Sequence, residues 1–318
     1  MKESVRIRRK QLLLVILCLL LCLSCGKAQT ADAAATPEEP AAEAVPSCAA
    51  ETAVPSPESD VPETETPQPV EAPTEVPTPT PEPTPVPVSD EQLDEGYLDA
   101  WFDDSVMVGD SIVAGLGRYV TGERDKGRPC LGKMRIVGVG GLTLRKALAA
   151  EQKKTDGALV FRSRFMTVSE VVEETQAKSL FILVGVRDLE SYSAEALIDA
   201  YDTFISIIKE NHPDLRIYVH SLMPMLKGFS MSVRQTADMN RAANEKLRAF
   251  CEEKGYTYLE LADLIRDEEG YLKYEYSGTD YSFHPNDIAR AIWVRLLRSC
   301  ARDEYYAGIW KPEETAND

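Results

Sequence analysis

A serine and a histidine, a pair that can carry out nucleophilic catalysis, stand at the ends of predicted strands far apart in this chain. Ser111 follows the apolar run Ser105–Val108 and the turn residues Gly109 and Asp110, and helically spaced apolar residues begin directly after it. This pattern predicts a buried strand, a sharp turn and a helix. A serine there can attack a carbonyl carbon, because nearby backbone N–H groups can stabilise the oxyanion. Helix capping by Ser111 is the alternative role.

His284 is the candidate base for this serine. It lies in the polar segment Asp280–Asn286, just before a predicted helix start, and has acidic residues beside it. A histidine that accepts the hydroxyl proton would activate Ser111 as a nucleophile. The other two histidines are His212, beside a proline, and His220, at the end of an apolar run, and we predict structural roles for both.

The elements that must position these residues form an alternating pattern of apolar runs and amphipathic segments. The runs are Ser105–Val108, Met134–Val139, Leu180–Val184, Leu215–Val219 and Tyr256–Leu259, and the amphipathic segments are Glu91–Phe102, Leu144–Ala150, Val168–Thr175, Ala194–Asn211, Arg234–Lys254 and Asn286–Ala301. Such alternation predicts a parallel sheet covered by helices on both faces. Ligands of such sheets bind beyond the carboxyl ends of the strands, where Ser111 and His284 are expected to lie.

The composition divides the chain into three parts. Fifteen of the 20 prolines lie between Pro37 and Pro87, and residues 28–90 hold 13 acidic and no basic residues. We therefore predict an extended, proline-rich linker over residues 26–90 and one globular domain over residues 91–318. Nothing in the sequence, whose net charge is −17, indicates the basic face expected of a nucleic-acid-binding protein, so we predict no nucleic-acid partner.

Residues 1–25 have the pattern of a secretory signal. Five basic residues precede the apolar run Leu12–Leu23, and Leu23-Ser24-Cys25-Gly26 resembles the cleavage site of bacterial lipoproteins. Lipidation at Cys25 would anchor the protein to the outer face of the cell membrane. The departure from the pattern is Cys22, where leucine is usual, and an uncleaved signal anchor is the alternative.

Metal and disulfide chemistry have little support in the sequence. Three scattered histidines and the lack of a C-x-x-C pair after the signal-like residues 1–25 give no metal-ligand spacing, so we predict no metal and no cofactor. Cys130, Cys251 and Cys300 are the cysteines of the globular domain. The sequence leaves open whether two of them form a disulfide, although free buried thiols are expected.

The order of the motifs resembles the SGNH, or GDSL-like, hydrolase family over residues 104–300. The matching blocks are Val108–Ser111, Gly141, Gly185–Asp188 and Phe283–Asn286. The resemblance implies a flavodoxin-like three-layer α/β/α fold with about five parallel strands. It also implies Ser111 as nucleophile, His284 as base and Asp280 as the residue that orients His284. The oxyanion hole would comprise the N–H groups of Ser111 and Gly141, with Arg187 as third donor.

Two positions depart from the family pattern. Arg187 stands where the family has an asparagine, and it could serve the oxyanion, bind a substrate carboxylate, or pair with Asp188 or Glu190. The family aspartate lies three residues before the histidine, where this chain has Tyr281; Asp280 lies four before. Either the longer loop still directs Asp280 to His284, or a Ser–His dyad operates with a backbone carbonyl orienting the imidazole.

Together these features predict a membrane-anchored, extracytoplasmic serine ester hydrolase. The expected substrates are acetyl or other short acyl esters on cell-envelope or extracellular glycans, or small ester-bearing molecules, an expectation that rests on location and family resemblance. Two alternatives remain open from the sequence. One is a catalytically impaired module that binds glycan, and the other is an O-acyltransferase with the same serine and histidine.

Overall fold

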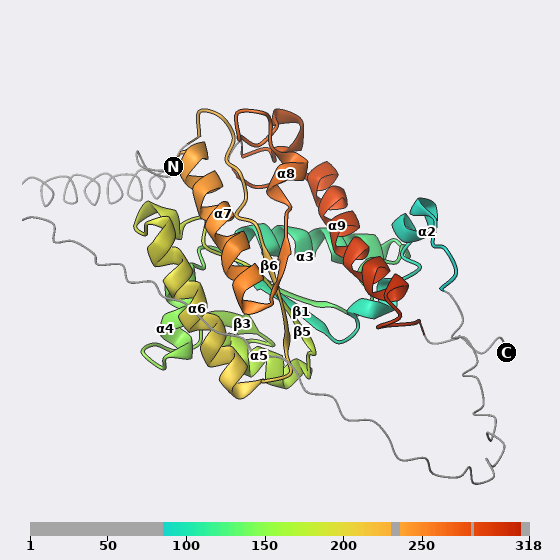
Figure 1. The fold of residues 1–318 in the computed structure, drawn as a ribbon, viewed down its shortest axis with the longest axis horizontal. Coiled ribbons are helices and arrows are strands. Elements are labelled where there is room, and N and C mark those ends of the chain that lie inside the picture. The colour runs from blue at the N-terminus through green and yellow to red at the C-terminus, as the bar shows by residue number, and fades with distance from the viewer. Residues whose placement is uncertain (1–84, 230–235, 281–282, 313–318) are drawn as a thin grey trace, which may run out of the picture. The chain divides into compact units, whose positions relative to one another are not determined.

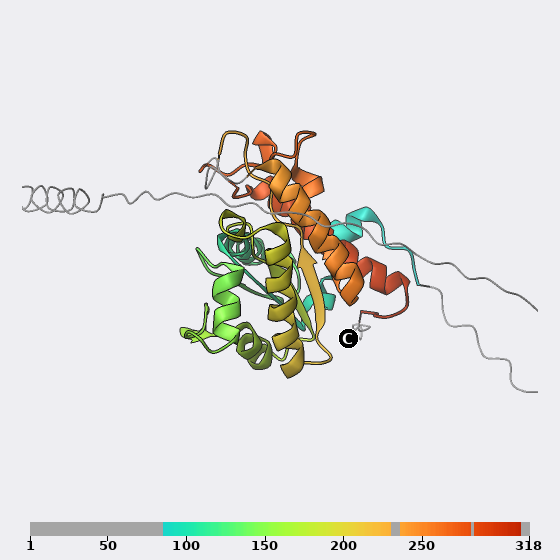
Figure 2. The ribbon, with the colours of Figure 1, turned by 60° about the vertical axis from the view of Figure 1, so that its left-hand side comes forward.

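The computed structural model describes residues 85–229, 236–280 and 283–312 (Figures 1 and 2). By its contacts the chain separates into two units, residues 1–77 and 78–318, and all described residues belong to the second unit. The predicted signal peptide, the lipidation candidate Cys25 and nearly all of the predicted linker lie outside the described residues. No helix among those residues is long and apolar enough to cross a membrane.

A five-stranded parallel sheet forms the centre of the described domain. Its strands are β1 (Ser105–Gly109), β2 (Arg135–Gly138), β5 (Ser179–Leu183), β6 (Arg216–His220) and β7 (Thr257–Leu259). They run in the order β2-β1-β5-β6-β7, which is the flavodoxin-like order 2-1-3-4-5. The predicted fold is thus confirmed. The chain places β2 on one side of β1 and β5, β6 and β7 on the other. The carboxyl ends of β1 and β5 therefore flank the expected ligand crevice.

Helices cover both faces of the sheet (Figure 1). Successive residues of a strand point to opposite faces, so each strand can contribute side chains to two separate cores. Met107 of β1 packs in one core, whereas its neighbours Val106 and Val108 pack in the other. The first core includes α2 (Asp90–Asp94), η1 (Asp99–Phe102), α3 (Ser111–Asp125), α8 (Ala262–Ile265) and α9 (Asp287–Tyr306). The second core includes α4 (Leu144–Glu151), α5 (Val168–Thr175), α6 (Ala194–Asn211) and α7 (Ala237–Lys254).

Two local predictions differ from the structure. The helix expected over Glu91–Phe102 is interrupted by a turn at Gly96, whose φ of +86° ends α2 before η1 begins. The hairpin of β3 (Leu159–Phe161) and β4 (Arg164–Met166) was not predicted. Its two turn residues, Arg162 and Ser163, both have positive φ, yet they lack the Asn-Gly or Asp-Gly signature that marks such turns.

The three cysteines of the domain are free thiols in the structure, which answers the question left open by the sequence. Cys130 and Cys251 are buried and Cys300 is partly buried. Burial raises the pKa of Cys130 to about 11 and the pKa values of Cys251 and Cys300 to about 12. All three therefore stay protonated at neutral pH, which makes them poor nucleophiles and poor metal ligands.

Candidate active site

The turn after β1 places Ser111 at the first position of α3. Gly109, the last residue of β1, has no room for a side chain, because a Cβ there would lie 2.2 Å from the carbonyl oxygen of Leu183. Asp110 then caps α3, with its Oδ1 accepting a hydrogen bond of 2.8 Å from the N–H of Ile112. The capping role considered for Ser111 therefore belongs to Asp110, and the half-buried Ser111 hydroxyl is available for other contacts.

The loop before α9 brings His284 to Ser111. The carbonyl oxygen of His284 accepts a 2.8 Å hydrogen bond from the N–H of Gly278. Two residues later, Asn286 caps α9 by accepting from Ile288 and Ala289, and its side chain also donates to the carbonyl of Glu275. These bonds fix the loop, and Nε2 of His284 lies 2.8 Å from Oγ of Ser111.

Asp280 completes a chain of three side chains. Its Oδ2 contacts Nδ1 of His284, on the side of the ring opposite to Ser111. The side chains are partly solvent-exposed, at 31% for His284 and 47% for Asp280. The four-residue spacing is thus compatible with a carboxylate–imidazole–hydroxyl arrangement, and Asp280 occupies the position left for a backbone carbonyl in the dyad alternative. Tyr281 lies outside the described residues.

Asp110 is a polar residue whose environment the sequence did not reveal. The residue is 1% exposed, and its Oδ2 has no hydrogen-bond partner among the described residues. Burial raises the pKa of the Asp110 carboxyl to about 6, and the charges of His284 and Arg187 partly oppose this shift. Asp110 therefore lies within electrostatic range of both residues. Only its position after glycine in the turn could have signalled a helix cap.

Gly141 and Arg187, the other two predicted oxyanion-hole residues, lie side by side. Gly141 has a φ of +74°, and a Cβ at this position would lie 3.8 Å from Nη1 of Arg187. A side chain at residue 141 would therefore have a strained backbone, although its Cβ would make only an ordinary contact with the guanidinium. The exposed guanidinium lies at the end of β5, next to the end of β1, where ligands of this fold bind.

Arg187 does not form the ion pairs that one interpretation assigned to it. Within the described residues, neither Asp188 nor Glu190 pairs with its guanidinium. The carboxylate of Asp188 instead accepts from the N–H groups of Leu144 (2.7 Å) and Arg145 (3.0 Å), at the start of α4. Asp188 is thus a structural residue that holds α4 against the loop after β5, and Arg187 stays available to a ligand.

The remaining histidines occupy different surroundings. His220 is fully buried, and its Nδ1 lies 3.2 Å from the carbonyl oxygen of Ile182. Burial lowers the pKa of His220 to about 4, so it is neutral at neutral pH. His212 contacts the carbonyl oxygen of Ser169 at 3.0 Å. In the part of the chain that the structure describes, no group of three or more His, Cys, Asp or Glu residues could hold a metal ion.

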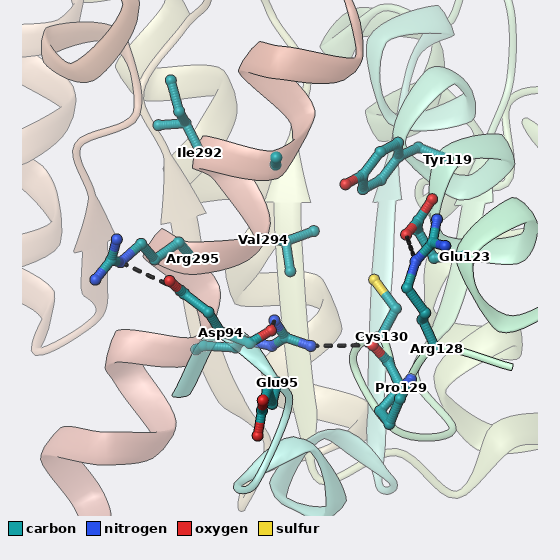
Figure 3. Close-up of a pocket in the computed structure, with 12 residues that line it drawn as sticks. Asp94, Glu95, Tyr119, Glu123, Arg128, Pro129, Cys130, Ile292, Val294 and Arg295 are labelled. Carbon is teal, nitrogen blue, oxygen red and sulfur yellow. Dashed lines mark hydrogen bonds and ion pairs between the residues drawn. The ribbon is translucent and has the colours of Figure 1, made fainter. Parts of the chain in front are cut away.

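A larger cavity, of about 680 Å³, lies away from this site between α2, α3 and α9 (Figure 3). Most of its charged side chains pair with neighbours: Glu123 with Arg128 at 2.5 Å, and Asp94 with Arg295 at 3.3 Å. Neither Ser111 nor His284 lines it. Oppositely charged side chains of this cavity already form ion pairs with each other. We therefore place the candidate active site at the sheet edge, although the cavity there is smaller.

Comparison with known families identifies the class of protein. Residues 107–292 match the model of the GDSL-like Lipase/Acylhydrolase family, a match that spans more than half of the chain and contains both Ser111 and His284. The chain belongs to this family. It is therefore a GDSL-like serine ester hydrolase.

Solved structures with a similar arrangement include a GDSL-like lipase from Bacteroides thetaiotaomicron. It is 14% identical, with 64% of this chain and 90% of that chain covered and a TM-score of 0.49. Another is a carbohydrate esterase family 3 protein from Talaromyces cellulolyticus, which is 14% identical, with 64% and 98% coverage and a TM-score of 0.39. A comparison with curated proteins found no match.

Proposed function

We propose that this protein hydrolyses acetyl or other short acyl esters carried by cell-envelope or extracellular glycans, with Ser111 as the nucleophile. The observation that carries the proposal is the continuous contact from Asp280 through His284 to Ser111, with a Ser111–His284 distance of 2.8 Å. A hydroxyl, an imidazole and a carboxylate in this order are the parts of a serine hydrolase triad.

The chemistry proceeds in two half-reactions. Nε2 of His284 accepts the hydroxyl proton while Oγ of Ser111 attacks the ester carbonyl, and the proton then passes to the departing alcohol. Water attacks the acyl–serine ester in the second half-reaction, releasing the carboxylic acid and returning the proton to Ser111. Asp280 accepts a hydrogen bond from Nδ1–H of His284, so that Nε2 is the unprotonated nitrogen that faces Ser111.

The oxyanion hole in this proposal comprises three donors. The N–H of Ser111 lies at the start of α3, where unpaired N–H groups and the helix dipole favour negative charge. The N–H of Gly141 and the guanidinium of Arg187 approach from the loops after β2 and β5. Arginine in place of asparagine adds a full positive charge to the donor, so it can offset the changed geometry.

The substrate and the location follow from the N-terminal sequence rather than from the described domain. The signal-like residues 1–25 and the acidic, proline-rich linker support a lipid anchor at Cys25 and a domain held outside the cytoplasmic membrane. Esters on glycans are the substrates within reach of a domain tethered in this way. The half-exposed His284 and Asp280 suit a substrate too large to be enclosed.

Labelling with a serine-reactive fluorophosphonate tests the catalytic proposal. The probe should form a bond between phosphorus and Oγ of Ser111 with loss of fluoride, and peptide mapping should find the modification on Ser111. Ser111→Ala should abolish both the labelling and the hydrolysis of 4-nitrophenyl acetate while the far-UV circular dichroism stays unchanged. Wild-type protein that neither labels nor hydrolyses any short ester would favour the glycan-binding alternative. Acetyl transfer to an added sugar in preference to water would favour the acyltransferase.

Mass spectrometry of the mature N-terminal peptide tests the proposed anchor. We expect a lipid-modified N-terminus at Cys25 in the wild type, and no acylation in Cys25→Ala. An unmodified N-terminus at Met1 in the wild type would contradict the proposed lipoprotein and leave the catalytic proposal untouched.

A further inference from the structure

A small cavity with three basic side chains adjoins the candidate oxyanion hole. It has a volume of about 200 Å³ and is lined by both Gly141 and Arg187, together with Arg145 and Lys146 of α4. A second cavity of about 400 Å³ shares Gly141, Arg145 and Lys146 with the first. The three basic residues therefore border the space directly beside the atoms that we assign to the oxyanion.

The basic side chains of this cavity outnumber its carboxylates. Among the described residues, the side chains of Arg145 and Arg187 form no ion pair, and Nζ of Lys146 donates to the carbonyl oxygen of Gly141 at 2.9 Å. Two carboxylates also line the cavity. They are Asp188, which accepts from two backbone N–H groups and on which the charge of Arg145 acts, and Glu190, so two negative charges face three positive ones.

The start of α4 does not itself provide an anion site here. Its N–H groups at Leu144 and Arg145 are occupied by Asp188, and that of Lys146 is occupied by Oγ1 of Thr143. An anion in the cavity would consequently be held by side chains. Guanidinium groups present parallel N–H donors that match two oxygens of a carboxylate, as they also match those of a phosphate, so a carboxylate is one anion that these side chains can bind.

The cavity also lies within electrostatic reach of the nucleophile turn. Nη1 of Arg187 is 3.8 Å from the place of a Cβ on Gly141, and the charge of Arg187 acts on Asp110, the residue next to Ser111. A carboxylate bound by Arg145 and Arg187 would therefore belong to the same substrate molecule as the ester attacked by Ser111.

We propose that Arg145, Lys146 and Arg187 form a specificity subsite for a carboxylate next to the scissile ester, so that the preferred substrates are acyl esters of acidic sugars or half-esters of dicarboxylic acids. This inference rests on the proposed function of the Ser111 site. Both substrate kinds place a carboxylate close to an ester, one on the alcohol part and the other on the acyl part.

Two matched pairs of esters test the subsite and separate these sources. For the alcohol part, 4-acetoxybenzoate is compared with its neutral methyl ester; for the acyl part, mono-4-nitrophenyl succinate is compared with its methyl ester. We expect kcat/KM of the wild type to favour the anionic member of at least one pair by about tenfold, the effect of a charge-assisted hydrogen bond. Raising the salt to about 1 M should reduce this preference, because the Debye length falls to about 3 Å.

Arg145→Gln and Lys154→Gln separate the subsite from the overall charge. Both substitutions remove one positive charge at exposed positions of the same region, but Lys154 lines neither cavity. We expect Arg145→Gln to lose most of the preference through a higher KM for the anionic ester, and Lys154→Gln to keep it. The inference would be overturned if the wild type had equal kcat/KM for both members of each ester pair. It would also be overturned if Arg145→Gln and Lys154→Gln lost the preference for the anionic ester equally; hydrolysis itself would remain intact in both cases.

A binding measurement keeps this test independent of turnover. Calorimetric titration of Ser111→Ala with 4-acetoxybenzoate, succinate half-ester and their methyl esters should show tighter binding of an anionic member, and Arg145→Gln in the same background should remove the difference. If the wild type hydrolyses no ester, the proposed function fails, and this titration alone then decides whether the carboxylate subsite exists. Binding that does not distinguish the anionic from the neutral members would contradict it.

Discussion

The catalytic sheet edge and the cavity of Figure 3 lie on the same domain and contain similar residue types, yet they differ in how their polar groups are used. In the cavity, Arg298 is 5% exposed and bonds to both oxygens of Asp99 at 2.8 and 2.9 Å. At the sheet edge, Arg187 is exposed and forms no ion pair within the described residues. The cavity is the larger space, about 680 Å³ against 200 Å³.

This difference teaches that the use of charge locates the chemistry better than volume does. A charge that is already paired and hydrogen-bonded stabilises the fold and offers little to a ligand, since binding would have to break the existing contacts. A charge without an internal partner is free to stabilise a substrate or a transition state. Substitutions in the two regions should therefore affect different quantities: activity at the sheet edge and stability around the cavity.

After Ser111→Ala, which should abolish hydrolysis, the largest effect at the sheet edge is expected from Asp280→Asn. An amide at this position can donate to Nδ1 of His284 and thereby favour the tautomer that cannot accept the proton of Ser111. We expect kcat to fall by a factor between about 10² and 10⁴. The factor should stay below about 10⁴ if solvent partly replaces the exposed carboxylate. Steady-state kinetics on 4-nitrophenyl acetate measures this, with Asp287→Asn, at an exposed carboxylate on α9, as control. Full activity of Asp280→Asn would indicate a Ser–His dyad.

Arg298→Ala should give the largest loss of stability in the cavity region. Its removal leaves Asp99 buried without its cation, which typically costs about 3–5 kcal/mol of the free energy of unfolding. Arg295→Ala, on the same helix but with a half-exposed pair to Asp94, should cost only about 0–1 kcal/mol. Urea unfolding measures both values. Equal stability of the two variants, or loss of esterase activity in folded Arg295→Ala, would break the division between the regions.

Substitution of Arg187 tests whether the exposed charge at the sheet edge contributes to activity. Removal of an oxyanion donor costs about 2.7–4 kcal/mol of transition-state stabilisation, so Arg187→Ala should lower kcat/KM by about 10²–10³-fold. Arg187→Asn restores the residue of the family pattern and should retain or raise activity on neutral esters. Arg118→Ala, an exposed arginine on α3, serves as the control. Activities of all variants within about threefold, the scale of an exposed ion pair, would rule out a role of Arg187 in the site.

The smallest effect concerns acid stability, where two buried groups oppose each other. His220 binds a proton near pH 6.5 when unfolded but near pH 4 when folded, so its contribution to stability is lost as the pH falls through this window. Asp110 has the opposite shift, from 3.8 to about 6, so the penalty for burying its charge is relieved as the pH falls through nearly the same window. The two contributions should largely cancel in the wild type.

Substitution of either Asp110 or His220 should reveal the pH dependence of stability that the remaining group contributes. Asp110→Asn should lose about 2 kcal/mol more than the wild type between pH 7 and about pH 4.5, because about 1.5 units of the shift lie in this range, at 1.36 kcal/mol per unit. His220→Gln should become relatively more stable over the same range. Chemical unfolding at the two pH values gives these differences. A parallel pH dependence of the wild type and both variants would show that neither shift contributes.

The sequence by itself determined the alternation of strands and helices and indicated the candidate pair Ser111 and His284. Apolar runs, four of them next to a glycine, identified the five strands of the sheet, because a parallel strand buried on both faces leaves a continuous hydrophobic signal. Ser111 and His284 followed from their positions at predicted strand and loop ends. The family blocks then added Gly141 and Arg187. Each of these signals is a local pattern, formed by residues that lie close together in the chain.

Tertiary structure decided which side chains meet. The contact of Asp280 with His284 depends on the path of a loop that is one residue longer than the family pattern, and the sequence allowed two outcomes. The lack of an ion pair at Arg187 arises because Asp188 is taken by the N–H groups at the start of α4, 43 and 44 residues away in the chain. Such competition between distant partners depends on packing in three dimensions, so the pattern of residues along the chain does not contain it.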